Sequence, residues 1–203
     1  SRDELMLEKL HSPFDIDHEE AVWYFGSEVG VASLQTLKEE MKNPDMRPDM
    51  RRICEGIGTD AIEPLLTIIH EDTTASPFPY KAEEMFLNAP QDIITFGDHA
   101  GLIRAGTATE CLWSIVGSED IDRFVDLYLQ EPAQPERAFA YSVLRRKHQE
   151  AWKYIAVKVK SGLSAEKSHK LIRYLMTAVL TQEGSQAIDS MTGDMTPEAL
   201  EGL

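Results

Sequence analysis

Amphipathic segments recur in pairs along the chain, and this repetition constrains the fold more than any other feature. Each pair consists of one amphipathic segment, a short Gly-Ser/Thr-acidic turn and a second amphipathic segment. Three such stretches are AVWYFGSEVGVASLQTLKEEMKN from Ala21, RRICEGIGTDAIEPLLTIIHEDT from Arg51 and ECLWSIVGSEDIDRFVDLYLQEP from Glu110. The turn glycines Gly26, Gly58 and Gly117 stand 32 and 59 positions apart, which leaves room for one more pair. A spacing of this size between helix pairs is typical of an α-solenoid.

Two further stretches complete the series. MFLNAPQDIITFGDHAGLIRA, with a turn near Ala89-Pro90, fills the gap, and YSVLRRKHQEAWKYIAVKVK, with a turn near Lys147, follows the last pair. Glycine can adopt the left-handed conformation that ends a helix, and the Ser or Thr after it can cap the next one. Breaks are expected at Asn43-Pro44, Thr73 to Pro79, Glu131-Pro132 and Ser161-Gly162. Alternating apolar and polar runs are missing, so the sequence predicts an all-α fold.

The paired helices resemble the HEAT family of repeats over roughly residues 18–161, most closely in the stretch that starts at Arg51. The resemblance implies an α-solenoid of about five HEAT-like helix pairs, in which each pair buries its apolar face against the next. Residues 164–181 predict one longer C-terminal helix that would cap the stack. An irregular α-helical bundle is the alternative fold. We expect a HEAT-like repeat domain over residues 1–182 and an acidic, flexible C-terminal tail over residues 183–203.

Charge is distributed unevenly along the 203 residues, whose formal net charge is −15. Residues 1–141 hold 11 basic and 28 acidic side chains (−17), residues 142–173 hold 9 and 2 (+7), and residues 174–203 hold 0 and 5 (−5). Nonspecific nucleic-acid binding depends on Lys and Arg at phosphates, so this acidic balance argues against it. No apolar stretch is long enough to cross a membrane and no leader opens the chain, which favours a cytoplasmic protein.

The residue types needed for catalysis or metal binding are present without a spacing that would bring them together. Cys54 and Cys111 lack a zinc spacing and are expected to be buried free thiols in a reducing compartment. The pairs His18-Glu19 and His70-Glu71 are suggestive of the HEAT-like deoxyhypusine hydroxylases, but they occupy unequal places in their units. The HEAT-like alkylpurine DNA glycosylases need a basic concave surface, whereas the first four units are acidic. The sequence therefore predicts no catalytic residue, metal site or cofactor.

Three groups of residues are candidate partner-binding surfaces. The basic stretch comprises Arg145, Arg146, Lys147, Lys153, Lys158 and Lys160. The acidic surface comprises Glu63, Asp92, Asp122 and Asp126 on the second helices of the pairs, which line the concave side in HEAT-like repeats. Phe78 and Tyr80, each preceded by Pro, form a possible aromatic anchor loop. Solvated helix faces, and aromatic side chains that fill the seam between units, are the plainer explanations of these groups, and packing explains Trp23-Tyr24-Phe25.

We expect the chain to act as a non-catalytic protein-binding adaptor or scaffold. An acidic inhibitor or immunity-type protein that occludes a basic partner, such as a nuclease toxin, is a second hypothesis. An enzyme whose site carries no recognisable motif is a third. The oligomeric state and the partner are not fixed by the residues.

Overall fold

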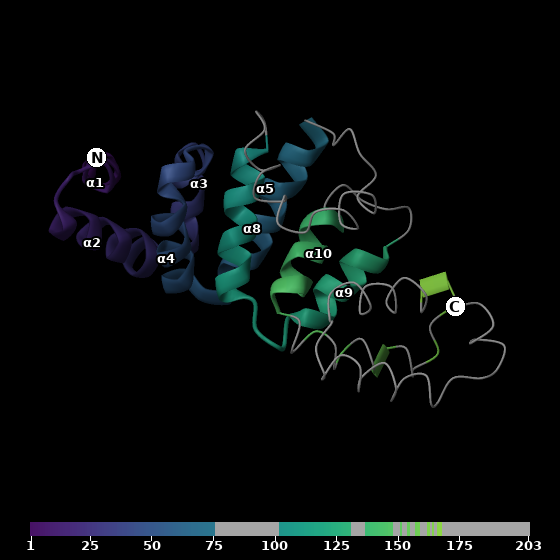
Figure 1. Ribbon diagram of the computed structural model, residues 1–203. Helices are drawn as coiled ribbons and strands as arrows, with labels where there is room; N and C mark the ends of the chain where they lie inside the picture. The colour runs from purple at the N-terminus through teal and green to yellow at the C-terminus, as the bar shows by residue number, and fades with distance from the viewer. Residues whose placement is uncertain are drawn as a thin grey trace. The chain divides into compact units, whose positions relative to one another are not determined.

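The computed structural model is helical throughout the part of the chain that it describes (Figure 1). The described residues are 1–75, 102–130 and 137–147, with single positions 151, 154, 157, 158, 162, 164, 166 and 167. Within these ranges no strand occurs, so the all-α prediction is confirmed for them. The chain divides into two compact units, Ser1–Gly117 and Ser118–Leu203.

The first unit opens with two short helices, α1 (Arg2–Leu10) and α2 (Asp15–Trp23). Ser1 caps α1, because its hydroxyl accepts a hydrogen bond from the Glu4 N–H at 3.2 Å while the Glu4 side chain reaches back to the Ser1 amino group. After α2 the backbone widens into a π-helix, η1 (Tyr24–Val29), which ends at Gly30 with φ 68°. A 3-10 turn, η2 (Gly30–Ala32), then leads into α3 (Ser33–Leu37).

Proline and glycine set the boundaries of the next helices. The 3-10 turns η3 (Glu40–Lys42) and η4 (Pro44–Met46) are separated by Asn43, whose side chain accepts a hydrogen bond from the Asp45 N–H at 3.0 Å. Helix α4 (Arg47–Ile57) ends at Gly58, which has φ 78°, and the 3-10 turn η5 (Gly58–Ala61) leads into α5 (Ile62–Ala75). The described part of the unit closes with α8 (Ile103–Ile115).

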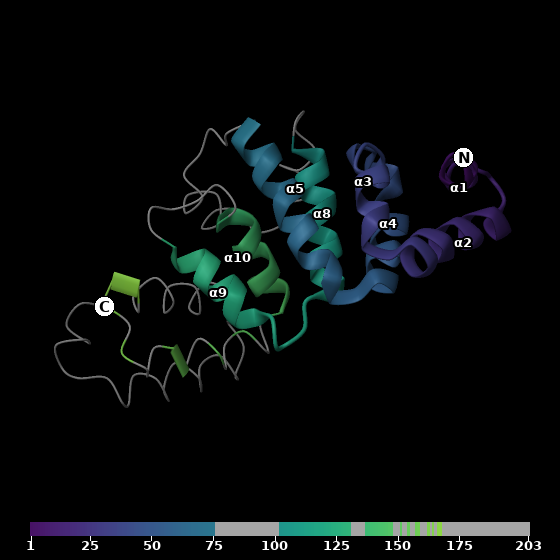
Figure 2. The same cartoon turned by 180° about the vertical axis from the view of Figure 1, so that it is seen from behind.

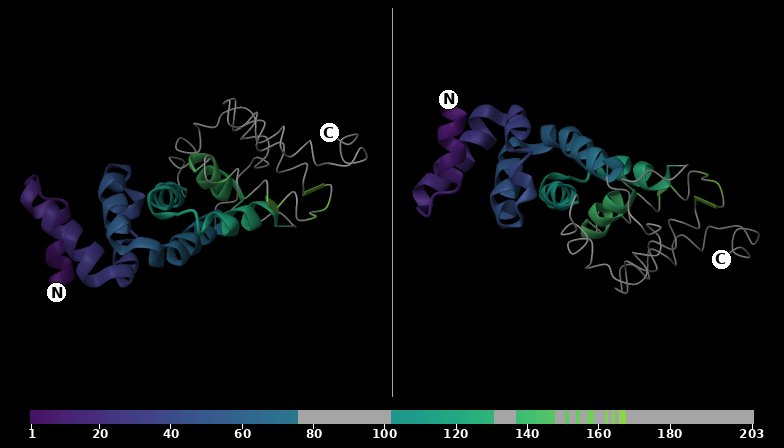
Figure 3. Two further views of the ribbon diagram at one scale, coloured as in Figure 1. Left: turned by 90° about the horizontal axis from the view of Figure 1, so that it is seen from below. Right: turned by 90° about the horizontal axis from the view of Figure 1, so that it is seen from above.

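Within the first unit the helices follow one another in a row. Helix α2 packs against α1, η1 and α4, while α8 packs against both α4 and α5. Figure 1 shows α1 and α2 at one end of this row, and the views from behind and along the vertical axis show the same succession (Figures 2 and 3). The core of the unit consists of fully buried apolar side chains, namely Leu10, Phe25, Leu37, Met41, Met50, Ile53, Ile62, Leu65, Ile69 and Leu112.

The second unit contains α9 (Ile121–Leu129) and α10 (Arg137–Arg146), which pack against each other. Phe124 and Val125 of α9 and Phe139, Val143 and Leu144 of α10 are almost completely buried. The rings of Tyr128 and Tyr141 lie 5.8 Å apart between their centroids, so an aromatic pair closes one side of this contact.

The turn glycines behave differently from one another. Gly58 has the positive φ that can end a helix, whereas Gly26 and Gly117 do not. The predicted turn at Gly117 is present between α8 and α9, but the predicted turn at Gly26 is wrong. Gly26 lies inside η1, and the close approach of α4 explains the residue type: a Cβ built on Gly26 would be 3.0 Å from the carbonyl oxygen of Ile53. Gly30, four residues later, has the left-handed conformation instead. Gly117 follows α8, which ends where Val116 becomes extended.

The predicted breaks agree with the structure in part. Asn43-Pro44 separates two 3-10 turns, and α9 ends before Glu131. Thr73, however, still lies inside α5. Its hydroxyl donates a hydrogen bond to the carbonyl oxygen of Ile69 at 2.7 Å, so the side chain has a hydrogen-bond partner within the helix. The turn near Ala89-Pro90, the capping helix over 164–181 and the tail over 183–203 lie outside the continuously described ranges. Among the described residues, no helix has the length and apolar character required to cross a membrane.

Candidate protein-binding surface

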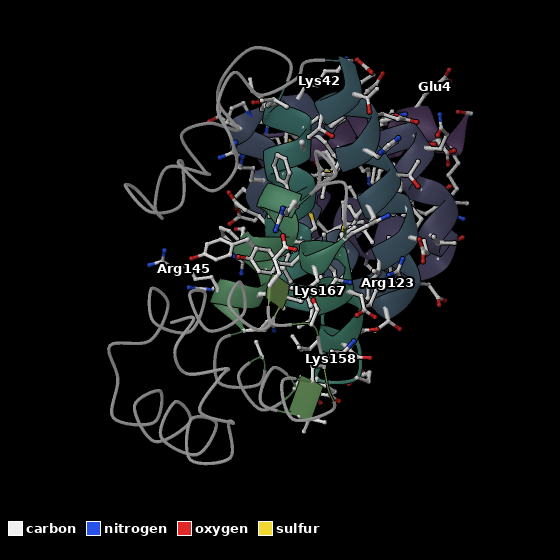
Figure 4. The ribbon with its side chains drawn as sticks, turned by 90° about the vertical axis from the view of Figure 1, so that its right-hand side faces the viewer. Glu4, Lys42, Arg123, Arg145, Lys158 and Lys167 are labelled. Carbon is white, nitrogen blue, oxygen red and sulfur yellow. The ribbon has the colours of Figure 1, made fainter. Side chains whose placement is uncertain are left out.

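The basic stretch is described at four of its six positions. Arg145 and Arg146 form the last turn of α10, and Lys147 follows in a turn; Arg145 and Lys158 are labelled in Figure 4. Within the described residues, Arg145 and Lys147 have no acidic partner. Lys153 and Lys160 lie outside the described residues.

Lys158 forms ion pairs with two carboxylates of α9. Its Nζ lies 2.5 Å from Oδ1 of Asp126 and 3.0 Å from Oδ1 of Asp122. Burial lowers the pKa of Lys158, but the hydrogen bonds to Asp126 and Asp122 more than offset this effect and raise it. One residue of the predicted basic stretch therefore pairs with two residues of the predicted acidic surface.

Of the remaining acidic and aromatic candidates, Glu63 alone is among the described residues. Glu63 lies exposed in the first turn of α5, in the first unit. Asp92, Phe78 and Tyr80 lie outside the described residues, so the aromatic anchor loop stays a prediction. The four acidic residues are thus divided between the two units, and a continuous acidic ring over them stays a prediction as well.

A second group of charges links three helical segments of the first unit. Arg104 of α8 donates hydrogen bonds from Nε to both carboxylate oxygens of Asp72 on α5, at 3.0 and 3.1 Å. The Arg104 guanidinium also lies 3.9 Å from Glu71 and 3.8 Å from Glu39, and Lys38 pairs with Glu71. Only 14% of the Arg104 side chain and 8% of the Asp72 side chain are exposed, so these two charges are mostly hidden from a partner.

Most of the exposed large apolar side chains lie early in the chain, and of these the sequence analysis names Trp23 alone. The described residues contain six exposed large apolar side chains, and five of them precede residue 32: Leu5, Phe14, Ile16, Trp23 and Val31. Trp23 is 59% exposed, so the expectation that packing explains it is wrong, whereas its neighbours Tyr24 and Phe25 are buried as expected. Large apolar side chains that are this exposed on a short segment are candidates for contacts with a partner.

The histidine, cysteine and carboxylate side chains do not converge in the described part of the chain. No group of three or more of them is placed to hold a metal ion there. His11 Nε2 lies 2.9 Å from Glu40, and His18 Nδ1 lies 4.0 Å from Asp49, each as an isolated pair. Cys54 on α4 and Cys111 on α8 are buried free thiols, as predicted.

Comparisons of the chain with family models, curated proteins and solved structures give no match. Function is therefore inferred from the residues of the chain itself.

Proposed function

We propose that the chain is a non-catalytic protein-binding adaptor or scaffold whose helix pairs stack as a HEAT-like α-solenoid. The observation that carries the proposal is the presence of five exposed large apolar side chains within residues 1–31 of the acidic first unit. Residues 1–117 hold 9 basic and 22 acidic side chains, which gives −13 of the total −15. A surface that combines apolar anchors with one sign of charge is suited to recognising a protein of the opposite sign.

Recurring ion pairs support the solenoid part of the proposal. In the first unit, Arg52 pairs with Glu19 and Lys38 with Glu71, each across 33 positions, and Arg104 pairs with Asp72 across 32. In the second unit, Lys158 and Asp126 are also 32 positions apart. These separations are close to the 32 positions between Gly26 and Gly58, as expected where each unit packs on the next. Helix α8 also contacts an earlier part of the chain: the Thr107 hydroxyl donates a hydrogen bond to the Met41 carbonyl oxygen at 2.9 Å.

The binding function is tested by isolating complexes of the tagged chain from native extract and measuring their mass by light scattering. We expect a stoichiometric protein partner that is retained at ~0.15 M salt and released at higher salt, because exposed charge pairs are screened. Arg145→Glu/Lys147→Glu is the appropriate charge variant for the basic stretch, since it leaves the Lys158 ion pairs in place. Recovery of the chain as a monomer without any partner under all of these conditions contradicts the proposal.

An acidic inhibitor is the second candidate, and the concentration of −13 in the first unit favours it. The two candidates differ in the number and chemistry of their partners. A single basic protein that is held tightly and loses its own activity in the complex indicates an inhibitor. Several proteins that bind weakly and compete with one another indicate an adaptor. The two buried free thiols fit a reducing compartment, so we place either function in the cytoplasm.

A further inference from the structure

Helix α2 has a buried face and an exposed face, and both carry apolar side chains. Ala21 and Val22 pack inward with 0% and 8% exposure. Ile16 and Trp23 are 79% and 59% exposed, and residues seven positions apart share one face of a helix. Phe14, which precedes the first turn of α2, is 66% exposed. A surface helix of a protein without a partner normally shows polar side chains on its outer face.

Within the described residues, the outer face of α2 has no covering element. The inner face of α2 packs against α1, η1 and α4. Helices α1 and α2 lie at the end of the row of helices in the first unit (Figures 1 and 2). In the described part of the chain, the side chains of Ile16 and Trp23 are therefore accessible to a partner.

The charges beside this face have an excess of carboxylates. Helix α2 contains four acidic residues, Asp15, Asp17, Glu19 and Glu20. Lys9 pairs with both Asp17 and Glu20, and Arg52 pairs with Glu19. The two cations offset two of the four carboxylate charges, so these six side chains have a net charge of −2.

This combination of side chains selects the chemistry of the occupant. Apolar side chains on one face of an incoming helix would pack on Ile16 and Trp23, and its Lys or Arg side chains would reach the carboxylates. The exposed indole of Trp23 is also a favourable contact for a Lys or Arg cation. Two copies of this chain that met through the same face would bring two negative surfaces together, which disfavours a symmetric dimer here.

We propose that the outer face of α2, with Ile16 and Trp23 as its anchors, is the docking site for a basic amphipathic helix of a partner protein. This inference rests on the proposed protein-binding function and specifies its surface and the class of its partner.

The test measures binding of three labelled 18-residue peptides to the full chain by fluorescence anisotropy. The first peptide has Leu at helical spacing on one face and Lys elsewhere; the second has Glu in place of Lys; the third has the composition of the first in an order without an apolar face. The protein variants are Ile16→Ser/Trp23→Ser and, as the control for loss of an exposed apolar side chain elsewhere, Val157→Ser, whose side chain is 66% exposed in the second unit. Circular dichroism verifies that each variant keeps the thermal midpoint of the wild type.

We expect the Leu/Lys helix to bind most tightly and the Leu/Glu helix not to bind. The Ile16→Ser/Trp23→Ser variant should weaken the Leu/Lys affinity about tenfold or more, because hot-spot side chains dominate such contacts. Val157→Ser should leave it unchanged. The proposal is overturned if the Leu/Lys helix binds the double variant as tightly as the wild type. It is also overturned if the Leu/Glu peptide, or the Leu/Lys peptide without an apolar face, binds the wild type as tightly as the Leu/Lys helix.

The outcomes also separate this inference from the protein-binding function. A native partner that is still captured by the double variant supports the proposed function and overturns the α2 site. A dimer of the wild type, detected by sedimentation and lost in the double variant, overturns the basic helix in favour of a second copy. Loss of the native partner from the double variant together with loss of the Leu/Lys helix supports the site.

Discussion

Arg104 on α8 holds both carboxylate oxygens of Asp72 on α5 through its Nε, at 3.0 and 3.1 Å. The Asp72 side chain is 8% exposed, so a neutral replacement leaves a mostly buried guanidinium without its main partner. We expect Asp72→Asn to lower the free energy of unfolding by about 1–3 kcal/mol. Urea unfolding measures the loss. Glu39→Gln is the control, because Glu39 is 72% exposed and 3.8 Å from the guanidinium; a loss equal to that of Asp72→Asn would contradict this account.

Glu71 makes the stability of the first unit depend on pH. The hydrogen bond from Lys38 lowers the pKa of Glu71 below its ordinary value of 4.5, and the charges of Lys38 and Arg104 act in the same direction. The contribution of the ion pair is therefore complete above about pH 5 and is lost as the pH falls through the lowered pKa. Glu71→Gln should lower the thermal midpoint at neutral pH, and the difference from wild type should shrink below pH 4.5 and in high salt. A difference that grows as the pH falls would contradict the prediction.

Gly26 and Gly56 allow η1 and α4 to approach closely. A Cβ on Gly26 would lie 3.0 Å from the Ile53 carbonyl oxygen, and a Cβ on Gly56 would lie 3.2 Å from the Gly26 Cα. Both neighbours are backbone atoms, which move less readily than a side chain. Gly26→Ala and Gly56→Ala should each lower the free energy of unfolding by about 1–3 kcal/mol, although alanine favours helices. Chemical denaturation is the measurement, and the exposed Ser27→Ala in the same π-helix should be nearly neutral.

Lys158 pairs with Asp122 and Asp126, two carboxylates that lie four positions apart on α9. Lys158→Met removes the cation and leaves Asp122 and Asp126 to repel each other. We expect a loss of about 0.5–1 kcal/mol, which Asp122→Asn/Asp126→Asn in the same background should partly restore. Thermal unfolding of the four variants of this cycle gives the coupling. Lys167→Met is the matched control, since the Lys167 side chain has no ion pair with the described residues.

The two cysteines should be chemically silent in the folded protein. Contact with Cys54 and burial both raise the pKa of the Cys111 thiol well above its ordinary value, so the reactive thiolate is scarce. Ellman's reagent should therefore label neither thiol at pH 8 and should label both of the 2 cysteines once denaturant unfolds the chain. Rapid labelling of the native protein, at a rate independent of denaturant, would contradict the buried placement.

Local features of the fold could be predicted from the sequence because a few neighbouring residues determine them. Gly58 shows this clearly: its place between two apolar helical stretches predicts the positive φ that the structure has. The π-helix at Tyr24–Val29 has no local signature, and Gly26 therefore resembles a turn glycine although it serves a close helix contact. Whether a segment is helical can be predicted from neighbouring residues, whereas the contacts between helices depend on the packing of the whole unit.

The candidate surfaces show the same division. The charge of Lys158, Asp122 and Asp126 is evident from the sequence, but their pairing across more than 30 positions is a tertiary property. The exposure of Trp23 was not predicted, because the choice between its face and that of Val22 depends on where α1 and α4 pack. The burial of Cys54 and Cys111 was predictable from their apolar helical surroundings.

Four ion pairs, Arg52–Glu19, Lys38–Glu71, Arg104–Asp72 and Lys158–Asp126, span 32 or 33 positions, and this has a consequence for how the chain folds during synthesis. Glu19 meets Arg52 after 33 further residues, and Asp72 meets Arg104 after 32, so each carboxylate emerges well before its cation. The loop that closes each pair is nearly the same length, and its entropic cost therefore does not rise along the chain. In the proposed solenoid, each new helix pair docks on one that is already in place, because folding proceeds from the N-terminal side as the chain emerges. Glu19 and Asp72 are made before Arg52 and Arg104, whereas Lys38 is made before Glu71, so charges of both signs lack their partner until the chain is 32 or 33 residues longer.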